Sequence, residues 1–139
     1  MNASTFDPDS FLDSTVNSNL STQPKLCDQG EHEAVIEKVT AETTPSGRVT
    51  LKVHWRPDGW PGFPIRQTVW LDLDDNGKID STEGANYQLG RLLEAVGQLG
   101  KKGWKPNDLV GGRALVMVDH VPSKDGTAIY DNVTRVSAL

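Results

Sequence analysis

Asp72–Glu83 (DLDDNGKIDSTE) joins a segment with the period of a strand to a segment with the period of a helix. Its acidic residues and Gly77 fall at the positions of the calcium-ligand loop of an EF-hand. Asp75-Asn76-Gly77 is also a strong turn signal, because Asn and Gly tolerate positive φ angles. The segments on either side therefore decide whether this stretch is a metal loop or a hairpin.

The flanking segments favour the hairpin. An EF-hand needs a helix on each side of its loop. The preceding segment, Ile65–Leu73 (IRQTVWLDL), has a period of two, and prolines interrupt the approach to it. Only the following segment, Asn86–Leu99, has apolar residues at helical spacing. We interpret the stretch as a strand end, a turn and the run into a helix; a calcium-binding protein using the EF-hand-like loop 72–83 is an alternative.

Strand-like segments and one helix follow each other in a familiar order. The segments are Glu31–Glu42, Arg48–Arg56, Ile65–Leu73, the helix Asn86–Leu99, Arg113–Val121 and Thr127–Val136. Short strands joined by tight turns, with a lone helix after the third, are typical of the OB-fold. We predict a mainly β protein over residues 29–139: a five-stranded OB-type barrel with one α-helix between strands 3 and 4.

Residues 1–28 differ in composition from the rest of the chain. They are rich in Ser, Thr, Asn and Asp, and their apolar residues show no sustained period. Such a segment buries too little apolar surface to offset the entropy of ordering, which predicts a flexible N-terminal arm. Alternatively, Phe6, Phe11 and Leu12 dock on a neighbouring subunit.

Composition and charge limit the classes of protein. The chain has 139 residues, 36% of them hydrophobic, and a formal net charge of −5. It contains no apolar run long enough for a membrane span and no secretory signal, and a single cysteine cannot form an internal disulfide. We expect a cytoplasmic protein. The acidic balance disfavours a surface that coats nucleic acid everywhere, but it permits one basic groove.

Cationic and aromatic side chains gather on one predicted face. In Arg48–Arg56 every second residue, Thr50 included, points away from the core, and the next strand adds its own outward set. Cations that follow phosphates and rings that stack under bases are what single-stranded nucleic acid requires. The candidate nucleic-acid-binding residues are Arg48, Lys52, His54, Arg56, Trp60, Phe63, Arg66 and Trp70.

The residue pattern offers no catalytic or cofactor chemistry. His32, His54 and His120 lie on different predicted strands, and one Cys gives no zinc spacing. The Gly-rich segments lack the Lys-Ser/Thr of a phosphate-binding loop. We therefore expect a protein that is not an enzyme, with no catalytic residues, no resident metal and no cofactor.

Gly84–Gly97 (GANYQLGRLLEAVG), Trp104-Lys105-Pro106 and Leu109–Ala114 (LVGGRA) together resemble a group of bacteriophage OB-fold single-stranded-DNA-binding proteins. The resemblance implies DNA binding without sequence preference, in phage DNA replication or recombination, in the host cytoplasm. Such proteins often end in an acidic tail that recruits partners, whereas this chain ends Arg135–Leu139 (RVSAL). Beside the resemblance, we expect a homodimer and replication proteins as further partners. The alternative to DNA binding is a protein-interaction module on the same barrel, in which Trp60 and Phe63 anchor a partner protein.

Overall fold

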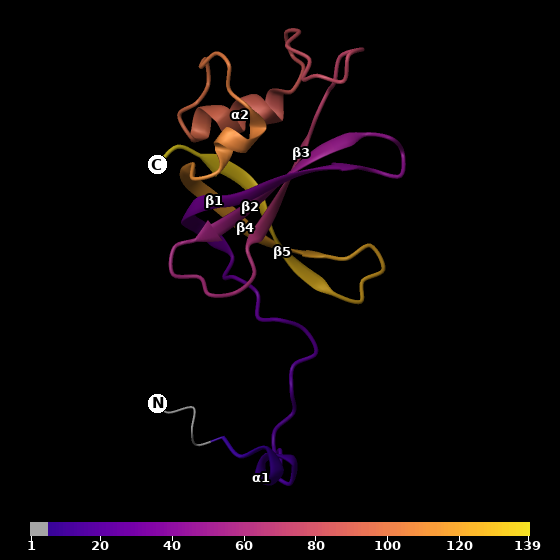
Figure 1. Cartoon of the computed structure of the whole chain (residues 1–139), viewed down its shortest axis with the longest axis vertical. Coiled ribbons are helices and arrows are strands. Elements are labelled where there is room, and N and C mark those ends of the chain that lie inside the picture. Colours follow the sequence, from indigo (N-terminus) through magenta and orange to yellow (C-terminus); the bar gives the residue numbers. More distant parts are fainter. Residues whose placement is uncertain (1–5) are drawn as a thin grey trace.

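The computed structural model describes residues 6–139, so the first five residues of the predicted arm lie outside the described part of the chain. Its elements are helix α1 (Pro8–Leu12), strands β1 (Gly30–Thr43), β2 (Val49–Pro57) and β3 (Ile65–Trp70), helix α2 (Tyr87–Ala95), the 3-10 helix η2 (Pro106–Leu109), and strands β4 (Arg113–Pro122) and β5 (Ile129–Ser137). In Figure 1 the strands wrap around one another, with α2 at one end and the arm leaving from the other.

The five strands form a closed barrel. Their spatial order is β1-β2-β3-β5-β4, and β4 pairs with β1 to complete the circle. All neighbours are antiparallel except β3 and β5, which are parallel and meet at one residue pair, Arg66 with Asn132. The predicted mainly β fold, a five-stranded OB-type barrel with a helix between strands 3 and 4, is confirmed.

The core follows from the alternation of the strands. Leu51, Val53 and Trp55 of β2 are buried together with Ile65 and Val69 of β3. Each apolar residue on one face of a strand meets its partners across the ladder, so the period of two in the sequence becomes the lining of the barrel. From α2, the buried residues Leu89, Leu92 and Leu93 join the same core. Helix α2 thus covers one end of the barrel (Figure 1).

Thr50 departs from the predicted alternation. It was expected to point to solvent, yet only 1% of it is exposed, and its Oγ1 has no hydrogen-bond partner among the described residues. Thr50 lies opposite Trp70 across the ladder, and the Arg48 guanidinium stacks on that indole. Bulky neighbours on the same face thus cover a small side chain, which alternation alone does not reveal.

Strand β3 is shorter than predicted, ending at Trp70 rather than Leu73. The backbone N–H of Trp70 donates to Gln88 Oε1 (3.0 Å), and that of Asp72 donates to Asn86 Oδ1 (2.7 Å). The Leu71 N–H still donates to the Val49 carbonyl of β2 (3.1 Å), but at Asp72 the chain bonds to the start of α2 instead of continuing the ladder. Leu73 and Ile79 then form an isolated antiparallel bridge around the predicted turn.

Helix α2 is also shorter than the predicted Asn86–Leu99. Asn86 sits before its first turn in the left-handed region (φ 56°), and Gly97 has φ 75°. A left-handed glycine ends a helix readily, and the Gln98 N–H closes the end by donating to the Leu93 carbonyl (2.8 Å). The helix thus keeps only the turns that cover the barrel.

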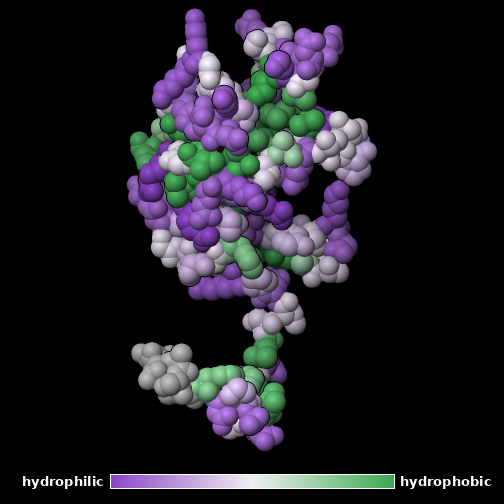
Figure 2. Space-filling model, in the orientation of Figure 1, coloured by the Kyte–Doolittle hydropathy of each residue, from purple (hydrophilic) through white to green (hydrophobic). Residues whose placement is uncertain are grey.

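The N-terminal arm carries helix α1 away from the barrel (Figures 1 and 2). The rings of Phe6 and Phe11 pack on each other with centroids 5.4 Å apart, and both remain exposed. The segment reaches the barrel at Cys27, which is buried and whose N–H donates to Asp131 Oδ2 (2.9 Å). In residues 6–139 no helix is long and apolar enough to cross a membrane.

Candidate functional site

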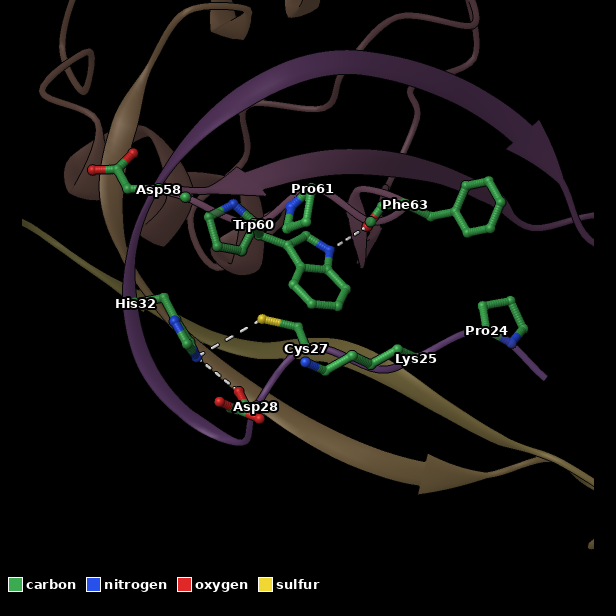
Figure 3. Close-up of a pocket in the computed structure, with 12 residues that line it drawn as sticks. Pro24, Lys25, Cys27, Asp28, His32, Asp58, Trp60, Pro61 and Phe63 are labelled. Atoms are coloured by element: carbon green, nitrogen blue, oxygen red, sulfur yellow. Dashed lines mark hydrogen bonds between the residues drawn. The ribbon is translucent and has the colours of Figure 1, made fainter. Parts of the chain in front are cut away.

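Two adjoining hollows lie at the end of the barrel opposite α2. The larger, of about 570 Å³, opens between the segment before β1 and the loop after β2 (Figure 3). The other, of about 440 Å³, continues onto the outer faces of β2 and β3 and reaches the start of β5. They share Pro24, Lys25, Trp60 and Phe63 as walls. We call the second hollow the β2–β3 groove; its lining includes Lys25, His54, Trp60, Phe63, Arg66, Ile129 and Tyr130.

The floor of the groove comes from neighbouring strands. His54 of β2 lies directly opposite Arg66 of β3, and Lys52 lies opposite Thr68 one step along the same face. Lys52 Nζ donates to Thr68 Oγ1 (2.7 Å). Within the described residues neither Lys52 nor Arg66 forms an ion pair. The structure thus brings three predicted site residues together in one row, two cations and an imidazole, which we call the cationic row.

His54 is held towards its neutral form. Burial lowers the pKa of its imidazole, and the positive charges of Lys38 and Arg66 lower it further, against weaker opposition from Glu42 and Glu37. An anion placed in the groove would reverse the charge effect and raise that pKa. The imidazole can therefore take up a proton when an anion binds beside it.

Arg56, another predicted site residue, has a different role. Its guanidinium pairs with Glu37 (Nε to Oε1, 2.7 Å) and donates to the backbone carbonyls of Trp60 (2.9 Å) and Gly62. These bonds hold the Gly- and Pro-rich loop that follows β2 in one shape. We assign Arg56 to positioning the loop rather than to contact with a ligand.

Trp60 and Phe63 occupy this loop in contrasting ways. Trp60 is half-buried against the core and donates from Nε1 to the Phe63 carbonyl (2.8 Å). The Phe63 ring points away from Trp60, and 74% of the residue is exposed (Figure 3). Trp60 therefore stabilises the wall of the groove, and Phe63 is accessible to a ligand.

The opposite wall contains residues that the sequence analysis missed. Ile129 and Tyr130 begin β5 and line the groove, and about half of each is exposed. Lys25 adds a cation from the segment before β1. An aromatic residue just after the Asp125-Gly126 turn was the available signal for Tyr130. Only closure of the barrel places it across from Phe63.

Arg48 and Trp70 lie apart from the groove, near the start of β2 and at the end of β3. The Arg48 guanidinium stacks over the Trp70 ring, 4.8 Å from its centroid, and its Nη2 is 3.7 Å from Asp72 Oδ1. Both partners of that ion pair are about half exposed, so water screens it. These two predicted residues form a separate cluster on the same outer face.

Two carboxylates of the 72–83 stretch, those of Asp74 and Asp80, bind the backbone of the stretch itself. Asp74 Oδ1 accepts from the N–H groups of Asn76 (2.9 Å) and Lys78 (3.0 Å). Asp80 Oδ1 accepts from the N–H and hydroxyl of Thr82, which lowers the pKa of this carboxyl. In residues 6–139 no group of three or more His, Cys, Asp or Glu side chains is arranged to hold a metal ion.

The larger hollow holds a cysteine beside a histidine. Cys27 Sγ lies 3.9 Å from His32 Nε2, and that nitrogen is 2.7 Å from the Asp28 carbonyl (Figure 3). Burial raises the pKa of the Cys27 thiol, and the charges of Asp131 and Asp28 raise it further. The thiol is therefore held protonated, unlike the thiolate of a nucleophilic cysteine.

No protein-family model matches the chain, and no curated protein is similar to it in sequence.

Proposed function

We propose that the protein binds single-stranded DNA without sequence preference in the β2–β3 groove. The observation that carries this proposal is that His54 and Arg66 line the same groove as two exposed rings, Phe63 and Tyr130. Lys52 continues the row along the same strand face, opposite Thr68. A strand needs cations along its phosphates and flat side chains for its bases, and such stacking is tolerant of sequence.

The charge distribution supports a local basic path on an acidic protein. Two acidic residues beside the loop are already paired with arginines, Glu37 with Arg56 and Asp58 with Arg113 (2.7 Å). Asp131 at the groove accepts the Cys27 N–H. The cations of the row have no such carboxylate partners in the described part of the chain, so they remain available to phosphates.

The biological setting of this proposal comes from the sequence resemblance alone. On that basis we propose a role in phage DNA replication or recombination, in the host cytoplasm, and we add a second copy and replication proteins as partners. The exposed Phe6–Phe11 pair of the arm offers apolar surface for such partners.

The proposal is tested by titrating the intrinsic tryptophan fluorescence with oligo-dT at two salt concentrations. We expect quenching, and an affinity that falls steeply with added salt because phosphate contacts release counterions. Tyr130→Ala removes a stacking ring and should cost about 1–3 kcal/mol of binding free energy. Lys52→Glu, which places a carboxylate in the row, should also weaken binding.

Lys102→Ala is the matched control, because this lysine is exposed in the connector after α2 and lines neither hollow. It should bind like the unaltered protein. If no oligonucleotide binds at low salt, the proposed function is wrong. A salt-insensitive association of the same groove with a protein would select the interaction-module alternative.

A further inference from the structure

Aromatic and cationic side chains also meet where β3 ends and α2 begins, away from the groove. Trp70 is the last residue of β3, and Tyr87 is the first residue of α2. Both line one hollow together with Arg48. The hydrogen bond from the Trp70 N–H to Gln88 Oε1 fixes the start of the helix against the end of the strand.

Each ring in this cluster is exposed and has a guanidinium beside it. Trp70 is 39% exposed and Tyr87 is 60% exposed. Arg48 lies 4.8 Å from the Trp70 ring centroid, and Arg91 lies 5.4 Å from that of Tyr87. Rings paired with arginines provide a stacking surface for a base next to a cation for its phosphate.

Further positive charge lies in the gap between β3 and β5. Because these strands meet at only one residue pair, they diverge towards α2 and leave a hollow of about 160 Å³. Thr68, Arg91 and Arg135 are among the residues that line it. Neither arginine forms an ion pair within residues 6–139, so both charges remain uncompensated by side-chain contact.

The groove and this cluster lie along one strand face. Arg66, Thr68 and Trp70 point to the same side of β3, since side chains alternate along a strand. Arg66 and Trp70 are four residues apart, or about 13 Å at the usual rise of a strand. Lys52, bonded to Thr68, lies between the two ends. The cationic row thus leads from the groove to the cluster.

We infer that Trp70, Tyr87, Arg91 and Arg135 form a second binding platform, which takes the continuation of the DNA strand whose first part lies in the β2–β3 groove. We call these four residues the α2 platform. The inference rests on the proposed function and extends it: the bound strand runs along β3 to the start of α2. A short oligonucleotide fills the groove alone, and a longer one reaches both.

The test compares oligo-dT of about 4 and about 16 nucleotides, the range of site sizes found for OB-folds. Tyr87→Ala should weaken binding of the long oligonucleotide about tenfold, the effect of losing one stacked base. It should leave the affinity for the short one unchanged. Tyr87→Phe keeps the ring and should restore the affinity for the long oligonucleotide.

Arg91→Ala tests the same platform independently, through the salt dependence of the DNA affinity. For the long oligonucleotide, the slope of log affinity against log salt should decrease in magnitude by about 0.7, the contribution of one phosphate contact on a single strand. For the short oligonucleotide the slope should not change. Tyr130→Ala, in the groove, should weaken both lengths. Thermal melting of each variant verifies that the barrel is folded.

Two results would overturn the inference while leaving the proposed function intact. One is unchanged binding of the long oligonucleotide by Tyr87→Ala and Arg91→Ala. The other is an equal loss for both lengths, which would place Tyr87 in the path of the first few nucleotides. Failure of the unaltered protein to bind DNA of any length is a separate outcome, and it removes the proposed function itself.

Discussion

The loop Asp58–Pro64 and the hairpin Asp72–Glu83 are both candidate binding sites, but their backbones are held by side chains of opposite kinds. In the loop, Arg56 and the Trp60 indole bind backbone carbonyls and thereby leave Phe63 presented to solvent. In the hairpin, the side chains of Asp74 and Asp80 bind backbone N–H groups. A side chain is available to a ligand only where the backbone does not need it.

The largest effect is expected at the base of the hairpin, from Asn86→Ala. This buried side chain accepts from the Asp72 N–H and donates to the carbonyls of Asp72 (2.9 Å) and Asp80 (2.8 Å). Its loss leaves buried groups unpaired and puts Ala in a left-handed conformation, so we expect the free energy of unfolding to fall by about 3 kcal/mol. Urea denaturation measures this.

Asn76→Ala is the control within the same hairpin, since the Asn76 side chain is exposed and none of the hydrogen bonds in the described structure uses it. Its free energy of unfolding should change by less than about 0.5 kcal/mol. Equal effects of the two substitutions would contradict the role assigned to Asn86.

At the loop, Arg56→Ala is expected to cost about 2 kcal/mol of stability, because it unpairs Glu37 and two loop carbonyls. DNA affinity should also fall several-fold, through a loosened loop rather than a lost phosphate contact. Arg113→Ala, which removes one exposed ion pair with Asp58, is the control and should change stability little. The Trp60 N–H donates to the Pro57 carbonyl (3.1 Å), so faster amide exchange of Trp60 in Arg56→Ala would identify the loosened loop. Unchanged exchange with weakened binding would instead make Arg56 a DNA contact.

A smaller effect is expected from pH at His54. Because its pKa is lowered in the folded protein, the unfolded chain binds more protons near pH 6, and this residue should make the protein less stable as pH falls through the ordinary histidine pKa of about 6.5. Bound phosphate favours the protonated imidazole, so DNA affinity should rise over the same fall in pH. His54→Gln should flatten both trends. Trends that survive the substitution would point to another titrating group.

The smallest effect is expected from calcium at the hairpin. Since Asp74 and Asp80 bind their own loop, millimolar calcium should leave the melting temperature unchanged. Magnesium at equal concentration is the control for ionic strength. A rise in melting temperature specific to calcium, lost in Asp74→Asn, would restore the calcium-binding alternative.

Alternation and turn residues were sufficient to predict the barrel, because the period of two in Arg48–Arg56 and the period of the helix are local properties of the chain. They also placed His54, Arg66 and Lys52 on one face. What they could not show depends on distant contacts. Tyr130 reaches the groove only through barrel closure. The Arg56 side chain bonds to carbonyls of the loop after β2, and the sequence pattern does not reveal where those carbonyls point.

The single residue pair between β3 and β5 makes this seam the least tightly bonded join in the barrel wall. Local opening costs least where the fewest backbone bonds must break, so breathing motions of the wall should begin here. One member of the pair, Arg66, also sends its side chain into the groove. A ligand that binds the Arg66 side chain would therefore stabilise the pairing of β3 with β5. Amide hydrogen exchange should then slow along β5, including at residues that the ligand does not contact.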